Sequence, residues 1–186
     1  MENPAGRVNG RAIASGLRGA AAVLSVAGGL YALVTWWPYA ADAAHHPVFG
    51  VVAILGGLAL LLTARPGWRI GWRGWAWVAF VAVAGTVVGL VISTDGICCV
   101  HLYSVHRGYP LRWLHDSTQL PSVMPTQQAR TVMLGRPDAV TRTVDWELAA
   151  ADALFWAYLG LVVVVTTRLA RRAVAALDGE AIGARP

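Results

Sequence analysis

Four apolar segments, each about as long as a membrane span, constrain this chain more than any other feature. They cover residues 19–37, 48–64, 75–93 and 148–167. A helix needs about 20 predominantly apolar residues to cross roughly 30 Å of hydrocarbon. The first three segments contain no charged residue, and the fourth contains only Asp152. The sequence therefore predicts an all-α membrane protein, built as a four-helix transmembrane bundle in the plasma membrane.

The composition supports a membrane protein over a soluble one. Hydrophobic residues make up 56% of the chain and charged residues only 13%, which is too apolar for an ordinary soluble domain. All 15 basic residues are Arg, a bias that we attribute to GC-rich coding in a bacterial genome. A nucleic-acid-binding protein gathers its basic residues on one folded face. Here the Arg residues flank the apolar segments, so we expect the lipid bilayer as a partner and no nucleic acid.

The distribution of Arg predicts the orientation of the chain. Ten Arg lie before the first span, between the second and third, and after the fourth, and Arg is enriched in cytoplasmic segments. Residues 94–147 carry five Arg against five acidic residues, and residues 38–47 carry no Arg. We therefore expect both termini, including the tail 168–186, to be cytoplasmic, and residues 38–47 and 94–147 to be extracytoplasmic. The alternative is a first span cleaved as a signal peptide after Ala41-Asp42-Ala43.

Small residues recur at a spacing of four on every predicted span, as Gly85 and Gly89 do on the third. Helices in lipid associate through close packing, which small residues permit. Because all four spans carry such a face, we expect packing within the chain's own bundle, with a homo-oligomer as the alternative. The Arg residues of the tail should anchor it at the interface or bind anionic lipid.

Signatures of transport and of catalysis are weak in this sequence. No Pro lies inside a span, and Asp152 is the only ionisable residue there. Transporters usually carry intramembrane carboxylates, His or broken helices, so a small-solute channel or exporter ranks as the second alternative function. The chain also lacks a phosphate-binding Gly loop, an HExxH motif and a nucleophile elbow. We therefore expect a protein that is not an enzyme.

The His and Cys residues all fall in the predicted outer segments. The residues that could share one soft metal such as Zn or Cu are Cys98, Cys99, His101, His106 and His115. Their spacing matches no zinc pattern, and adjacent Cys residues rarely reach one ion with tetrahedral geometry. An extracytoplasmic metal-binding or thiol-redox protein is therefore the first alternative function. The competing interpretation is that these are interfacial residues with local hydrogen bonds.

The segment 94–147 also predicts local structure. β-branched residues on both sides of Gly135-Arg136-Pro137-Asp138 predict a short β-hairpin over residues 131–144. The carboxylate of Asp145 favours the opening of the last helix. Asp152 lies seven residues later on the same helix face and should pair with a loop side chain. We predict a structural clamp that holds the loop to the last helix, formed by Arg112, Trp113, Asp145 and Asp152.

A resemblance rests on the run Gly108-Tyr109-Pro110-Leu111-Arg112-Trp113 and on Val144-Asp145-Trp146 at the opening of the last helix, which carries Asp152, Phe155 and Trp156. This part of the chain resembles small multi-pass membrane proteins of unknown function in prokaryotes. The resemblance covers only the loop and the last helix. It implies a comparable loop anchored to the final helix, and it brings no activity. The leading functional interpretation is a non-enzymatic scaffold or accessory subunit whose outer loop contacts another membrane or extracytoplasmic component.

Overall fold

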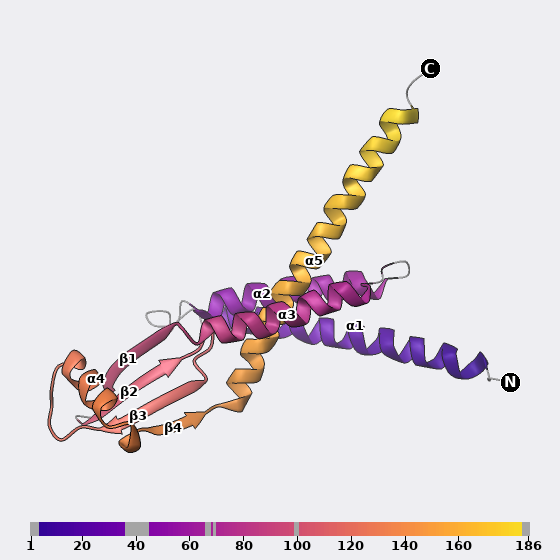
Figure 1. Cartoon of the computed structure of the whole chain (residues 1–186). Coiled ribbons are helices and arrows are strands. Elements are labelled where there is room, and N and C mark those ends of the chain that lie inside the picture. The colour runs from indigo at the N-terminus through magenta and orange to yellow at the C-terminus, as the bar shows by residue number, and fades with distance from the viewer. Residues whose placement is uncertain (1–3, 36–44, 66–67, 69, 99–100, 184–186) are drawn as a thin grey trace. The chain divides into compact units, whose positions relative to one another are not determined.

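The computed structural model describes residues 4–35, 45–65, 68, 70–98 and 101–183, and within them the side chains of 16–34, 47–65, 68, 70–97 and 101–176. In chain order the elements are α1 (Pro4–Thr35), α2 (His45–Ala64), α3 (Trp72–Gly89), β1 (Ser93–Cys98), β2 (Leu102–Arg107), β3 (Leu114–Gln119), α4 (Thr126–Gly135), a 3-10 turn (Pro137–Ala139), β4 (Thr141–Val144) and α5 (Trp146–Gly183), as Figure 1 shows. They form two compact units. We call residues 1–81 with 157–186 the helical unit and residues 82–156 the sheet unit.

Four helices are long and apolar enough to cross a membrane, which confirms the predicted number. The qualifying segments among the described residues are Gly16–Val34, Pro47–Ala64, Trp72–Gly89 and Trp146–Ala176. The third helix ends at Gly89, earlier than the predicted residue 93. There the amides of residues 90–92 donate to carbonyls three residues back, which tightens the last turn. Ser93 then opens a strand, as the β-branched residues around it favour. The end of the first predicted span, residues 36–37, lies outside the described residues.

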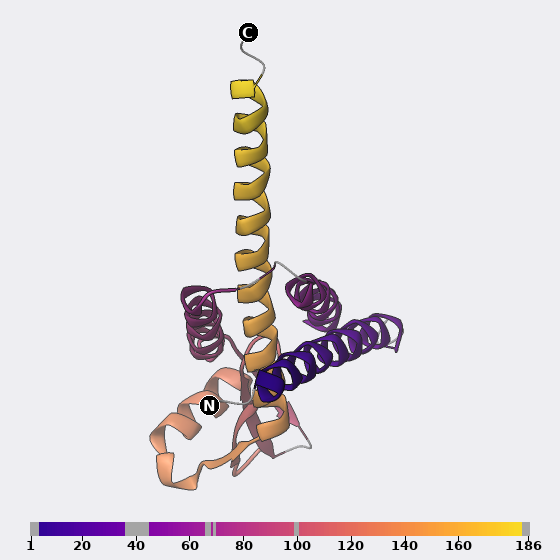
Figure 2. The ribbon, with the colours of Figure 1, turned by 90° about the vertical axis from the view of Figure 1, so that its right-hand side faces the viewer.

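Small residues let α1 and α2 lie in close contact along the helical unit, side by side in both Figure 1 and Figure 2. A Cβ atom on Gly29 would lie 2.6 Å from the carbonyl oxygen of Gly50, and one on Gly57 would lie 2.8 Å from that of Ala22. Such approaches exclude any larger residue. A second buried cluster of this unit joins α2, α3 and α5, and comprises Ala59, Val78, Leu161 and Val165. The small residues on these faces of α1 and α2 therefore permit close helix packing within the chain.

The sheet unit contains a four-stranded antiparallel sheet with the order β1-β2-β3-β4. Tyr103 and Val105 of β2 point to one face and are buried there against Ala129 and Met133 of α4, with Leu120 completing the cluster. Residues directly opposite one another in an antiparallel pair share a face. The pairs Val105↔Asp116 and Asp116↔Arg142 therefore place Asp116 and Arg142 on this same face.

The chain is mostly helical, as predicted, but it also contains this small antiparallel sheet, and the predicted two-stranded hairpin over residues 131–144 is wrong. Residues 131–135 belong to α4 rather than to a strand. Ala129 and Met133 lie one turn apart and are both buried, so packing of this helix face on the sheet outweighs the strand propensity of the β-branched residues 131 and 132. Residues 141–144 do form a strand, but it pairs with β3, with Leu114 opposite Val144.

Candidate functional site

The sheet presents a polar face on the side opposite α4. The register places His106 opposite both Thr94 and His115, and Ser104 opposite Ser117. Because side chains alternate along a strand, these residues point away from the buried Tyr103 and Val105. We call this surface the polar face and define it by Thr94, Ser104, His106, His115, Ser117, Thr141 and Thr143. Hydroxyl and imidazole groups dominate it.

A pair of histidines occupies the middle of the polar face. The Nδ1 atoms of His106 and His115 share a hydrogen bond, and the two rings meet edge to face with centroids 4.7 Å apart. The Nε2 atom of His106 lies 3.2 Å from the hydroxyl of Ser104. Burial lowers the pKa of His106, and the nearby His115 and Arg112 lower it further. The lowered pKa favours the neutral form of the His106 imidazole.

An open cavity of about 210 Å³ lies beside this pair, against the edge strand β1. Its lining comprises Thr94, Asp95, Gly96, Ile97, Ser104, His106 and Arg112. The Thr94 hydroxyl is buried and makes no hydrogen bond within the described part of the chain. The Asp95 carboxylate accepts a hydrogen bond of 2.8 Å from the hydroxyl of Tyr103. The cavity thus combines the Asp95 carboxylate, which Tyr103 already engages, with a guanidinium, hydroxyl and imidazole groups, and these last three are donors that bind a carboxylate or another anion.

An ion pair on the other face fixes the strands that carry the histidines. Asp116 is 1% exposed, and its Oδ1 accepts a hydrogen bond of 2.6 Å from the Nε of Arg142. The Arg142 Nη2 donates to Oδ2 at 3.2 Å, and Arg107 lies 3.9 Å from the same oxygen. These contacts tie β3 to both of its neighbours. Sequence reasoning missed Asp116 and Arg142 because each stands among polar residues with no distinguishing spacing.

The loop between β2 and β3 is fastened to the first turns of α5 within the sheet unit. The indole Nε1 of Trp156 donates to the carbonyl of Tyr109 at 3.0 Å, and the amide of Leu111 donates to Oδ1 of Asp152 at 3.3 Å. The amide of Asp145 donates to the carbonyl of Trp113 at 2.8 Å. The Tyr109–Pro110 peptide is cis.

Gly108 starts this loop with a φ of 121°, a value that L side chains rarely adopt. A Cβ atom there would overlap the Leu111 carbonyl oxygen and would lie 2.8 Å from the Trp113 ring. The loop backbone at Leu111 therefore packs closely against Gly108, and the Trp113 ring also packs against Gly108.

The four residues predicted as a clamp occupy two different places. Asp145 caps α5, since its Oδ1 accepts a hydrogen bond of 3.0 Å from the amide of Leu148. Asp152 is fully buried beneath the loop. Its Oδ2 atom and the Nε1 atom of Trp113 make no hydrogen bond within the described residues. Arg112 lies apart from these three in the lining of the His106 cavity.

The residues predicted as metal ligands are also divided. His106 and His115 are in contact, whereas Cys98 pairs with Leu102 at the far end of β1 and β2. His101 precedes β2 by one residue, so it lies about 16 Å along the strand from His106 at roughly 3.3 Å per residue. Cys99 lies outside the described residues. Where the structure is described, no group of three or more His, Cys, Asp or Glu side chains is arranged to hold a metal ion.

The resemblance of the 108–113 run and of the α5 opening to small prokaryotic membrane proteins stays a prediction, because comparison of the chain with protein-family models, curated proteins and solved structures finds no match.

Proposed function

We propose that this chain is a non-enzymatic accessory protein of the plasma membrane, which binds an extracytoplasmic or membrane protein partner through the polar face of its sheet unit. The observation that carries the proposal is the grouping of Arg112, His106 with its partner His115, and the unsatisfied Thr94 hydroxyl at one open cavity. Four apolar helices are compatible with a membrane anchor. The opposite face of the sheet is occupied by α4 and offers no comparable site among the described residues.

The chemistry of the cavity supports a partner that presents a carboxylate. Arg112 is a permanent cation with a planar fork of donors that matches a carboxylate. Thr94 and Ser104 add hydroxyl groups at the same cavity. The nearby positive charge helps to lower the pKa of His106, so a bound anion would relieve this effect and raise the pKa again. An acidic side chain or a C-terminal carboxylate of the partner would satisfy these groups.

A photo-crosslinking experiment tests this proposal. A benzophenone amino acid is introduced at Gly96, where a side chain meets nothing within 4 Å, and in a separate variant at the exposed Arg130 of α4. In native membranes we expect a discrete crosslinked product from position 96, absent from position 130 and lost when Arg112→Gln is added. Equal products from both positions, or a product that Arg112→Gln leaves unchanged, would contradict the proposal.

Metal binding is a second candidate function, favoured by the direct contact of His106 with His115. Two imidazoles on neighbouring strands can ligate one Zn or Cu ion together with water. Elemental analysis of the purified protein separates this candidate from the first. Stoichiometric metal that disappears in His106→Gln/His115→Gln and persists in Cys98→Ser/Cys99→Ser would support it, whereas metal-free wild-type protein would reject it.

A further inference from the structure

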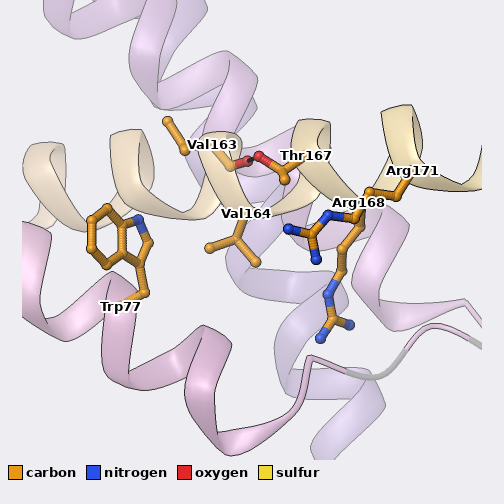
Figure 3. A pocket seen from close by; sticks show the side chains of 6 residues that line it. All are labelled: Trp77, Val163, Val164, Thr167, Arg168 and Arg171. Atoms are coloured by element: carbon orange, nitrogen blue, oxygen red, sulfur yellow. Dashed lines mark hydrogen bonds between the residues drawn. The ribbon is translucent and has the colours of Figure 1, made fainter.

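A pocket between α3 and α5 of the helical unit joins apolar and basic side chains. It has a volume of about 330 Å³ and is lined by Trp77, Val163, Val164, Thr167, Arg168 and Arg171. Figure 3 shows Trp77 extending from α3 toward α5, with both guanidinium groups on the same side of α5. Arg168 and Arg171 are three residues apart, so they share one helix face. The pocket thus has two cations at one end.

The charge of this pocket is entirely positive. Its lining contains two Arg and neither Asp nor Glu. The sequence carries no acidic residue between positions 43 and 94 or between positions 153 and 177, so both flanking segments lack carboxylates as well. A guanidinium pair binds phosphate oxygens through short, charge-assisted hydrogen bonds. Charge complementarity therefore favours an anionic group here.

Neighbouring arginines are held by aromatic rings at the same ends of α3 and α5. The guanidinium of Arg172 lies 4.5 Å from the centre of the Trp68 ring, and that of Arg73 lies 5.8 Å from the Trp72 ring. Such contacts fix a cation over an aromatic face. Trp and Arg together are typical of the level at which a span leaves the hydrocarbon. This end of the helical unit therefore has the composition of a headgroup interface.

The apolar end of the pocket is accessible. Val163 is 45% exposed and Trp77 is 48% exposed. From Val163 to Arg171 the helix rises by about 12 Å at 1.5 Å per residue. Over this length the pocket lining changes from apolar side chains to guanidinium groups. A phospholipid changes in the same order, from its acyl chains to its phosphate. The Thr167 hydroxyl donates to the carbonyl of Val163 at 2.7 Å, so the two guanidinium groups dominate the polar end of the pocket.

We propose that the helical unit binds an anionic phospholipid in this pocket, with its phosphate on Arg168 and Arg171 and an acyl chain against Trp77 and Val163. The site is independent of the polar face of the sheet unit, so each proposal can fail without the other. Basic pockets between transmembrane helices recognise anionic headgroups in this way. The occupant is a lipid rather than free phosphate, because the pocket adds a wall of hydrocarbon to the two cations.

Native mass spectrometry of the full-length protein in detergent tests the proposal, with dioleoyl phosphatidylglycerol and dioleoyl phosphatidylcholine as probes. We expect one phosphatidylglycerol to bind in preference to phosphatidylcholine, and inorganic phosphate not to displace it. Since each Arg near a membrane surface contributes on the order of a fivefold change in affinity, Arg168→Gln/Arg171→Gln should weaken phosphatidylglycerol binding about 30-fold. Arg130→Gln/Arg136→Gln, which removes two exposed Arg of the sheet unit, is the control with the same net charge and should bind as wild type does.

A second variant tests the hydrocarbon wall without changing the charge. Val163→Trp fills the exposed edge of the pocket and should also reduce phosphatidylglycerol binding, with circular dichroism confirming that the variant is folded. Equal binding of the two lipids by wild type, equal loss in both double-Arg variants, or full binding by a folded Val163→Trp variant would each overturn the proposal.

Discussion

At the scale of single residues, Tyr103 is a polar group that is fully enclosed by the sheet unit. Its side chain is 0% exposed, and its hydroxyl donates to Oδ2 of Asp95 at 2.8 Å. Burial, followed by the hydrogen bond and the charge of Asp95, raises the pKa of Tyr103 to about 12. The folded protein therefore keeps a phenolic proton that the unfolded chain releases near pH 10.

This difference predicts how stability depends on pH. The contribution of Tyr103 is complete below pH 10 and is lost as the pH rises from about 10 to about 12, because over that range the folded state binds more protons than the unfolded state. Tyr103→Phe should lower the free energy of unfolding at pH 8 by about 1 kcal/mol and should lose less stability than wild type between pH 10 and 12. Unfolding of both proteins in detergent, followed by circular dichroism from pH 8 to 12, checks this. Parallel pH profiles would show that Tyr103 does not titrate as argued.

At the scale of elements, the end of α3 and the β2–β3 loop depend on a glycine contact within the sheet unit. A Cβ atom on Gly89 would lie 2.9 Å from the carbonyl oxygen of Tyr109 and 3.1 Å from its amide nitrogen. Both contacts are with backbone, so the loop would have to move as a whole. The same loop is fastened to α5 by Trp156 and Asp152.

Gly89→Ala should therefore destabilise the sheet unit by about 1–3 kcal/mol, the range observed when an atom is forced into a packed contact. Gly28→Ala is the matched control, because its Cβ atom meets nothing within 4 Å and Ala is favoured over Gly in a helix by about 0.5–1 kcal/mol. Thermal unfolding of the two variants and wild type in one detergent gives the comparison. Equal shifts in the two variants would remove the proposed role of the Gly89 contact.

The same elements show what the sequence could predict. The spans were predictable because a helix in lipid must be apolar along its whole length. The strand β3 was not, because its two buried positions are Asp116 and Thr118, so it shows no hydrophobic alternation. The contact of His106 with His115 depends on the register of β2 with β3. The distance of these two histidines from Cys98 and His101 depends on strand pairing too. These residues were predicted to share one metal ion because they are close in the sequence. The strands instead hold His106 and His115 together and place Cys98 at the other end of the sheet.

At the scale of the whole molecule, charge distribution and the number of apolar helices together predict the topology. An even number of spans predicts that both termini lie on the same side of the membrane, and the Arg-rich segments predict that this side is the cytoplasm. Cleavage of the first span as a signal peptide would instead leave three spans. The intact mass of the purified protein distinguishes these two outcomes directly.

Cysteine accessibility tests the orientation in cells. In a Cys98→Ser/Cys99→Ser background, single cysteines are placed at Ser122, which is exposed in the sheet unit, and at Ala176, which is exposed near the end of α5. A maleimide that cannot cross membranes should label Ser122→Cys on intact cells, and should label Ala176→Cys only after the membrane is permeabilised. Labelling of Ala176→Cys on intact cells would reverse the assigned orientation and would place the Arg168–Arg171 pocket on the outer surface, away from the cytoplasmic leaflet where basic segments meet anionic lipid.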